Sequence, residues 1–208
     1  MSAIFSGLLL ALIFPKFNLW WVAWFALLPL LYAVRRAKNA RAAFWCGYLA
    51  GLPFYGVTFA FIFALGEWVG GLIFIGWVLL TIFLSLYTAI FAYLLKKLGP
   101  SSLIAPFIWV FIEWLRSLGP FGLVPYLGYS QWQVLPLIQV VSVVGVAGLS
   151  FIIVLANALL AAILFDRKYS LAGILVLLLL VIFSFGWWQL KSPPPVDGKS
   201  LSLVMIQA

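Results

Sequence analysis

Long apolar runs, separated by short polar, glycine- or proline-containing breaks, dominate the chain. About 20 apolar residues suffice for a helix to cross the hydrocarbon core of a bilayer. The pattern predicts an all-α polytopic membrane protein with about seven transmembrane helices. The predicted spans are Ala3–Phe14, Leu19–Val34, Ala42–Leu65, Val69–Leu95, Ser101–Leu115, Ala147–Phe165 and Leu171–Leu190. The first run is short, and with Leu19–Val34 it is expected to form a tight hairpin.

The run Leu135–Phe165 is too long for one simple span, because it contains 31 residues. Gly145 and Gly148 lie inside it, and glycine is typical of points where a helix is interrupted. We therefore expect a division there. Leu135–Val144 is predicted to be a re-entrant or interfacial piece, and Ala147–Phe165 the span.

Composition excludes several functional classes. Hydrophobic residues make up 67% of the 208 residues and charged residues 8%, against about 25% charged residues in soluble domains. A soluble enzyme is excluded for most of the chain. The net charge of +8 does not indicate nucleic-acid binding, because the basic residues lie in short clusters between apolar runs. The chain has no histidine and one cysteine, which argues against a metal site, and we expect no cofactor.

Basic residues predict the orientation of the chain, since Lys and Arg are enriched in cytoplasmic loops. The residues assigned to these loops are Arg35, Arg36, Lys38, Arg41, Lys96, Lys97, Arg167 and Lys168. With alternating spans, the chain leaves the membrane on the outer side after Leu190. Most tryptophans then map to the outer side, which indicates that the outer face is the working face.

The C-terminal residues differ in character from the apolar runs. Residues 191–200 are proline-rich and polar, as is typical of a linker, and residues 201–208 have the composition of a β-strand. A single strand has no partner for its backbone groups. The sequence therefore predicts a membrane domain over residues 1–190, a linker on the outer face, and the first strand of a domain that this chain does not contain.

Two ionisable residues stand out in the fifth predicted span. Glu113 and Arg116 are three residues apart, so their side chains share one helix face. Ionisable groups at membrane depth are rare and commonly functional. Two interpretations remain open: a structural ion pair that closes the helix end, or a site that holds a lipid headgroup or docks another domain.

The outer loop Gly119–Gln133 is unusually apolar and aromatic for a solvated loop. Its hydroxyl and amide groups, from Tyr126, Tyr129 and Gln131, are candidate ligands for a lipid ester or headgroup. The alternative is packing in the headgroup zone or beneath an outer domain.

Other polar or small residues are assigned structural roles. Cys46 has no base to activate its thiol and is expected to be buried. Gln139, Ser142 and Asn157 are expected to form hydrogen bonds between helices. The glycines of the segment Gly47–Gly51 predict close helix packing.

Several short motifs resemble the membrane domain of bacterial apolipoprotein N-acyltransferases. The motifs are Glu113-Trp114-Leu115-Arg116-Ser117, Gly119-Pro120-Phe121-Gly122, Gly128-Tyr129-Ser130-Gln131, Gly145-Val146-Ala147-Gly148-Leu149-Ser150-Phe151, the early Phe14-Pro15 and the final Leu203-Val204-Met205-Ile206-Gln207. The chain departs from the family at Val124-Pro125-Tyr126, where the family often has Phe-Pro-Trp.

The resemblance implies a phospholipid as acyl donor and a diacylglyceryl apolipoprotein as acceptor, with a thioester intermediate on the enzyme. It implies an inner-membrane protein, with a catalytic Glu-Lys-Cys set in an outer, α/β nitrilase-like domain. None of these three residues matches a position here, so no catalytic residue is assigned and the chain alone is expected to be inactive. We expect a monomer. The alternative functions are a membrane transporter and a non-catalytic anchor or scaffold.

Overall fold

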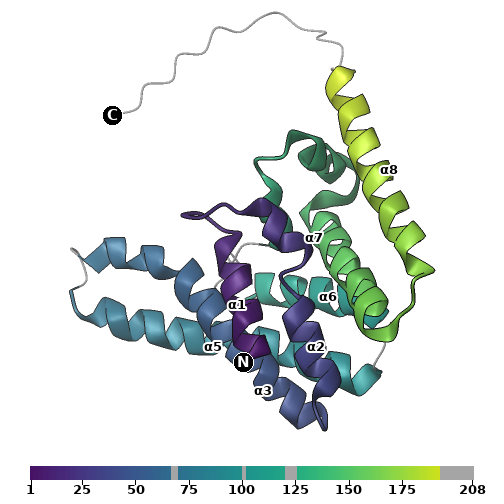
Figure 1. Ribbon diagram of the computed structural model, residues 1–208. Helices are drawn as coiled ribbons and strands as arrows, with labels where there is room; N and C mark the ends of the chain where they lie inside the picture. Colours follow the sequence, from purple (N-terminus) through teal and green to yellow (C-terminus); the bar gives the residue numbers. More distant parts are fainter. Residues whose placement is uncertain (67–69, 100–101, 120–125, 193–208) are drawn as a thin grey trace, which may run out of the picture.

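Helices and 3₁₀ turns make up the regular secondary structure of the computed structural model, which describes residues 1–66, 70–99, 102–119 and 126–192 (Figure 1). The α-helices are α1 (Ser2–Leu12), α2 (Leu28–Arg36), α3 (Ala40–Thr58), α5 (Leu72–Leu98), α6 (Ala105–Ser117), α7 (Leu135–Asp166) and α8 (Leu171–Lys191). The 3₁₀ turns are η1 (Trp20–Trp24), η2 (Ala60–Leu65), η3 (Ser102–Ile104) and η4 (Leu127–Gln131). The all-α class is confirmed over these ranges. The predicted strand at 201–208 and most of the predicted linker lie outside the described residues.

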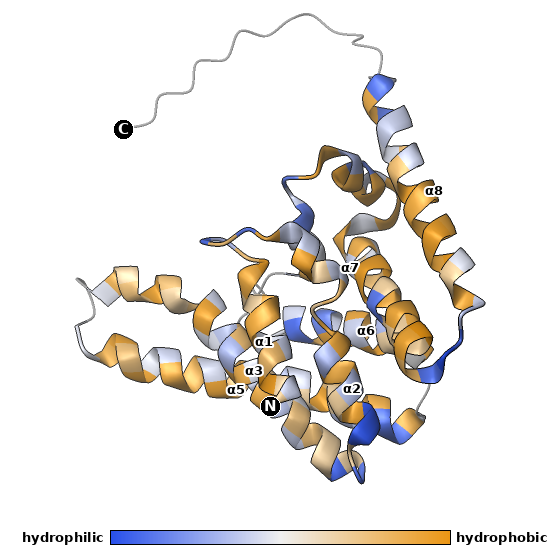
Figure 2. Ribbon diagram, in the orientation of Figure 1, coloured by the Kyte–Doolittle hydropathy of each residue, from blue (hydrophilic) through white to orange (hydrophobic). Residues whose placement is uncertain are grey.

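Three of these helices, α5, α7 and α8, are long and apolar enough to cross a membrane. Figure 2 shows that hydrophobic residues make up most of α8. The prediction of a helix over Leu171–Leu190 is confirmed, and the helix predicted over Val69–Leu95 is described as Leu72–Leu98. These two helices could be predicted from the sequence, because no break interrupts either apolar run and each run is long enough for a membrane-spanning helix.

The prediction of a continuous helix over Leu19–Val34 is wrong. The segment begins as the 3₁₀ turn η1, and α2 starts only at Leu28, with Pro29 in its first turn. Asn157 of α7 stabilises this interruption, because its side chain accepts a hydrogen bond from the Leu27 N–H at 3.0 Å and donates one to the Ala23 carbonyl at 2.9 Å. The backbone groups freed by the break are thus satisfied inside the protein.

Two further predicted spans are shorter α-helices in the structure. The run Ala42–Leu65 divides into α3, which ends at Thr58, and the 3₁₀ turn η2. The run Ser101–Leu115 becomes η3 followed by α6, whose first turn contains Pro106. The 13 residues of α6 span only about 20 Å at ~1.5 Å per residue.

The predicted division of the long run is confirmed at Gly145. Its φ of 68° and ψ of 176° interrupt the helical geometry of α7 and separate a short first segment from the longer segment that follows. Only glycine adopts this backbone conformation without substantial strain. Whether the segment Leu135–Val144 is re-entrant stays a prediction.

Small residues bring α3 and α5 into close contact, as predicted. A Cβ atom at Gly47 would lie 2.3 Å from the Thr88 carbonyl oxygen, and one at Gly51 would lie 2.7 Å from the Ser85 Cα. Glycine is required at both positions, since a larger side chain would force the helices apart. The packing of α3 on α5 places Tyr55 and Thr88 inside the domain, where both are 2% exposed.

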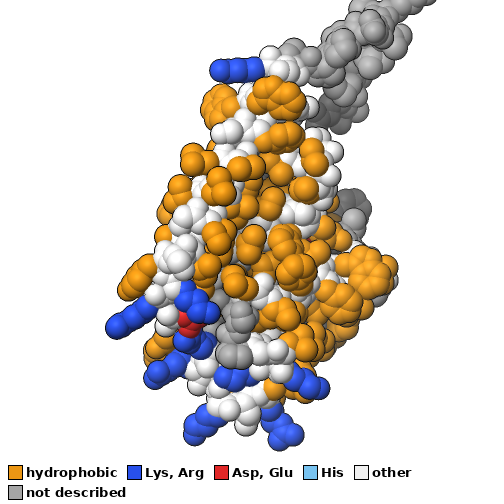
Figure 3. Space-filling view, turned by 90° about the vertical axis from the view of Figure 1, so that its right-hand side faces the viewer, with side chains coloured by type: hydrophobic (Ala, Val, Ile, Leu, Met, Phe, Trp, Pro, Cys, Tyr) orange, Lys and Arg blue, Asp and Glu red, His pale blue; other side chains and the backbone are white. Residues whose placement is uncertain are grey.

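Basic side chains lie together at one end of the molecule, around a single acidic group (Figure 3). There the C-terminal ends of α2, α5 and α7 meet: Arg35 forms an ion pair with Asp166, and Lys96 Nζ donates to the Arg35 carbonyl at 3.0 Å. We call this the basic end. The predicted clustering of these residues is confirmed, whereas the side of the membrane that they occupy stays a prediction.

Helix α8 packs mainly on α7. Its buried Ile182 joins Leu137 and Val140 of α7 in a small apolar cluster. Gly186 marks the closest approach, since a Cβ there would lie 2.0 Å from the Pro136 carbonyl oxygen. Much of the remaining α8 surface is exposed and apolar, as expected for a helix in contact with lipid.

Candidate functional site

A buried carboxylate, that of Glu113, is the centre of the polar network in this domain. Glu113 is 2% exposed and lies one turn before the end of α6. Arg116, one turn further along the helix, is 4% exposed, and its positive charge stabilises the carboxylate. The prediction that these two side chains share one face of the helix is confirmed, and that face points into the protein.

The Glu113 carboxylate holds a neighbouring loop in place. Its Oε1 atom accepts a hydrogen bond from the Trp109 indole at 2.9 Å and another from the Leu127 backbone N–H at 2.7 Å. Trp109 lies one turn earlier in α6, and Leu127 is the first residue of η4. Both donors are themselves buried, so each needs an acceptor within the protein. The carboxylate therefore fixes the start of η4 against α6.

Two more side chains complete the attachment of η4. The Gly128 N–H donates to Ser150 Oγ of α7 at 2.9 Å. Gln131 is fully buried; its Oε1 accepts from the Trp24 indole at 3.2 Å, and its Nε2 donates to the Trp20 carbonyl at 3.0 Å. The turn η4 is thus bonded to α6, α7 and η1, three elements far apart in the sequence.

Arg116 connects this network to α3. Its guanidinium donates to the Tyr55 hydroxyl at 2.9 Å. Together with Thr88 of α5 and Glu113, these residues border a small cavity of about 10 Å³, measured as the space open to the centre of a water molecule. Apolar side chains from the same helices, Phe91, Trp109 and Ile112, line the rest of it. The cavity lies where α3, α5 and α6 meet.

The candidate lipid-binding residues fall into two groups. Glu113, Arg116 and Gln131 are buried among protein groups. Tyr129 is 52% exposed, and Tyr126 is half-buried, with the two ring centroids 6.0 Å apart. Only the tyrosines present side-chain surface outside the domain, so the two groups are suited to different roles.

Only part of the predicted outer loop is described, because residues 120–125 lie outside the described residues. Most of η4 is buried, with hydrogen bonds to α7 and η1. These hydrogen bonds draw an apolar segment with polar backbone groups into the interior. The placement of this loop in the headgroup zone stays a prediction.

Sequence reasoning missed several residues of this network. Trp109 precedes Glu113 by four residues, so helical spacing alone could have identified it. Tyr55 is 61 residues from Arg116 along the chain, and no local pattern signals that contact. Ser150 lies within one of the family-like motifs. Its role was still not predictable, because its partner, the Gly128 N–H, is a backbone group without a sequence signature.

The minor predictions have mixed outcomes. The buried Asn157 forms the hydrogen bonds between segments that were predicted for it. Ser142 instead donates to the Gln139 carbonyl of its own helix, at 2.7 Å. The prediction that Cys46 is buried is wrong, since it is half-buried at the edge of the core. Glu67 lies outside the described residues.

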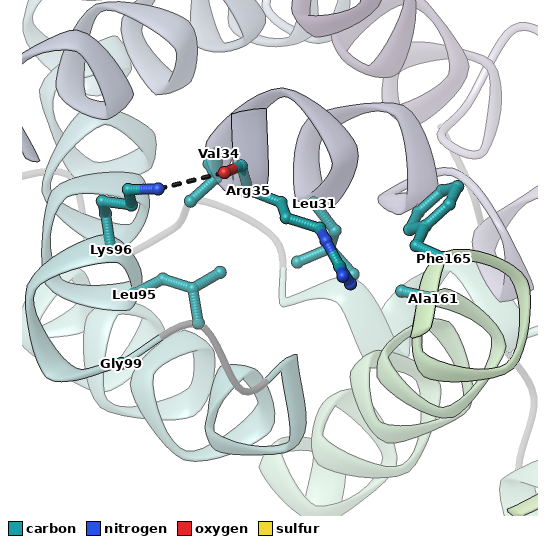
Figure 4. A pocket seen from close by; sticks show the side chains of 8 residues that line it. All are labelled: Leu31, Val34, Arg35, Leu95, Lys96, Gly99, Ala161 and Phe165. Carbon is teal, nitrogen blue, oxygen red and sulfur yellow. Dashed lines mark hydrogen bonds between the residues drawn. The ribbon is translucent and has the colours of Figure 1, made fainter. Parts of the chain in front are cut away.

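A second cavity, of about 20 Å³, lies at the basic end between α2, α5 and α7 (Figure 4). Leu31, Val34, Leu95, Ala161 and Phe165 supply its apolar lining, and Arg35 and Lys96 flank it. Both cations already have partners within the protein: Arg35 forms an ion pair with the Asp166 carboxylate, and Lys96 donates to the Arg35 carbonyl. Among the described residues, no group of three or more metal-ligating side chains comes together.

Comparison with known proteins shows the family. The model of the apolipoprotein N-acyltransferase N-terminal domain matches residues 6–159. The chain belongs to this family. Curated apolipoprotein N-acyltransferases with similar sequences include those of Geobacter metallireducens (35% identical, 100% of this chain and 42% of the relative), Pasteurella multocida (32%, 91% and 38%) and Gloeobacter violaceus (31%, 100% and 42%). The chain thus spans about two fifths of the length of these apolipoprotein N-acyltransferases.

Proposed function

We propose that this chain is the membrane domain of an enzyme that transfers an acyl chain from a phospholipid to the N-terminal S-diacylglyceryl-cysteine of lipoproteins. The observation that carries the proposal is the match of residues 6–159 to the N-terminal domain of the apolipoprotein N-acyltransferase family. The long apolar helices α5, α7 and α8 support the membrane location. In this proposal the domain crosses the bacterial inner membrane about seven times, and the chain leaves it on the outer side after α8.

We propose that the domain supports the reaction without supplying its nucleophile. The chain has one thiol and no histidine, so Cys46 lacks the usual general base that activates a cysteine. Cys46 is packed against apolar core residues at the edge of the core. The thioester chemistry then belongs to the family's nitrilase-like domain, and the isolated chain is inactive.

The site residues divide their tasks in this proposal. Glu113 and Gln131 hold η4 in position from inside the domain, and Arg116 joins the same network to α3, as their burial and hydrogen bonds support. Tyr126 and Tyr129 contact the phospholipid donor near its headgroup, which the exposed Tyr129 ring supports. Tyrosine suits this position, because its ring prefers the membrane interface while its hydroxyl binds polar groups.

A chimaera tests the proposal. Residues 1–190 of this chain replace the matching segment of the Geobacter metallireducens relative, and acyl transfer from a fluorescent phospholipid to a diacylglyceryl lipopeptide is measured. We expect turnover by the chimaera and none by the 208-residue chain alone. A folded, membrane-inserted chimaera without turnover would contradict the assignment, as would turnover by the chain alone.

The role of the tyrosines is tested in the same chimaera. Tyr129→Ala is expected to raise the KM for the phospholipid several-fold, and Trp132→Ala, which removes an exposed aromatic ring three residues away, is the matched control. An unchanged KM in the first variant would refute lipid contact at Tyr129 without affecting the family assignment.

A further inference from the structure

Five buried side-chain oxygen atoms have no hydrogen-bond partner among the described residues, and two of the five belong to residues that border the same cavity. These two are Glu113 Oε2 and Thr88 Oγ1, on side chains that are each 2% exposed. A buried polar atom without a partner is costly, and a carboxylate oxygen especially so. The two atoms come from different helices, α6 and α5, which meet at the cavity.

The cavity has the size and the chemistry of a site for one water molecule. Its volume of about 10 Å³ is close to the minimum of ~10–15 Å³ for a buried water, which also requires two to four polar partners. Glu113 Oε2 offers an acceptor, and the Thr88 hydroxyl a donor. Tyr55, whose hydroxyl accepts from Arg116, borders the same cavity and offers a third group.

We propose that a single buried water molecule binds here and bridges α5 to the Glu113 carboxylate. The water donates one hydrogen bond to Glu113 Oε2 and accepts one from Thr88 Oγ1. Glu113 Oε1 already accepts from Trp109 and Leu127, and the Ser150 hydroxyl also interacts with the carboxyl group, so this water adds a further donor, at Oε2. Thr88 is then a positioning residue: it acts through the water and Glu113 on η4.

Thr81 provides a matched control in the same helix. Its Oγ1 atom is likewise buried without a partner among the described residues, but Thr81 does not border this cavity. Replacing either threonine by valine removes one hydroxyl and keeps the side-chain shape. The two variants therefore differ in whether the residue that loses its hydroxyl borders the cavity beside Glu113.

The direct test is a structure of the whole chain in lipid nanodiscs at a resolution that shows ordered water. We expect a water peak within hydrogen-bond distance of both Glu113 Oε2 and Thr88 Oγ1, which is lost in Thr88→Val. A dry cavity in the parent protein would overturn the proposal, as would a Thr88 hydroxyl bonded to a carbonyl of its own helix.

Amide hydrogen exchange tests the consequence for η4. In Thr88→Val we expect the Leu127 N–H to exchange about tenfold faster, the size of effect that follows from loss of one hydrogen bond to a charged group. Thr88→Ser should restore slow exchange, and Thr81→Val should leave it unchanged. Equal acceleration in both valine variants, or no rescue by serine, would refute the positioning role.

Discussion

Replacing Glu113 by leucine removes the acceptor that two buried N–H groups share. The Trp109 indole and the Leu127 amide both donate to its Oε1 atom, at 2.9 and 2.7 Å. Neither donor can form a hydrogen bond with solvent water instead, because Trp109 is 5% exposed and Leu127 is 1% exposed. The substitution therefore leaves two donors without a partner and removes the charge that faces Arg116.

The expected loss of stability follows from these contacts. A buried donor left unsatisfied costs about 1–3 kcal/mol, so two of them cost about 2–6 kcal/mol. Hydrogen bonds measured inside membrane proteins are weaker, about 0.6 kcal/mol on average, because the unfolded chain in the bilayer finds other partners. We therefore expect Glu113→Leu to lower the free energy of unfolding by about 2 kcal/mol, near the lower end of the first range.

The assay is reversible denaturation of the purified chain in mixed micelles, followed by helical circular dichroism. Glu113→Gln is the matched control, since its amide oxygen can still accept both hydrogen bonds, and it should lose less than half as much stability. A Glu113→Leu variant as stable as the parent protein would refute the assignment of Glu113 as the anchor of η4. Equal losses in both variants would show that the charge, rather than the acceptor, is what stabilises the site.

Three further substitutions test the packing and the polar network, each by thermal unfolding of the chain. Gln131→Leu removes two hydrogen bonds to η1 and should cost about 1–3 kcal/mol, whereas the exposed Gln133→Leu should have little effect. Gly47→Ala places a Cβ 2.3 Å from a backbone oxygen and should cost about 1–3 kcal/mol, while Gly173→Ala, with open space around it, should raise stability by about 0.5–1 kcal/mol. Gly145→Ala should cost about 1–3 kcal/mol through backbone strain alone, because no atom lies within 4 Å of the added Cβ. A stable Gly47→Ala or Gly145→Ala variant, or equal losses at the two glutamines, would contradict the corresponding contact.

The apolar pattern predicted those parts of the fold whose conformation depends on local sequence. Helices α5 and α8 follow from run length alone, and the break in α7 follows from a glycine in a run too long for one span. The division of Leu19–Val34 could not be predicted in this way. The turn η1 depends on Gln131 and Asn157, whose contacts with it lie 111 and 134 residues away along the chain.

The candidate site shows the same limit. The sequence identified Glu113 and Arg116, because ionisable residues are rare in apolar segments, and helical spacing correctly placed them on one face. It could not show that Glu113 accepts a hydrogen bond from the Leu127 backbone N–H, because a backbone donor has no sequence signature. Nor could it show which residue on α3 receives the Arg116 hydrogen bond, because that depends on how α3 packs beside α6.

The way in which α8 is attached has a mechanical consequence. Residues that follow Lys191 are joined covalently to the domain through α8, and α8 meets the domain most tightly where Gly186 abuts Pro136. A tilt of α8 therefore displaces the first residues of α7 through this contact. Two routes connect that contact to η4: the short segment 132–134, and α7 itself from Pro136 through the break at Gly145 to Ser150, which holds η4. A movement of α8 is therefore passed to the Glu113 network along both routes, and the break at Gly145 lies on only one of them.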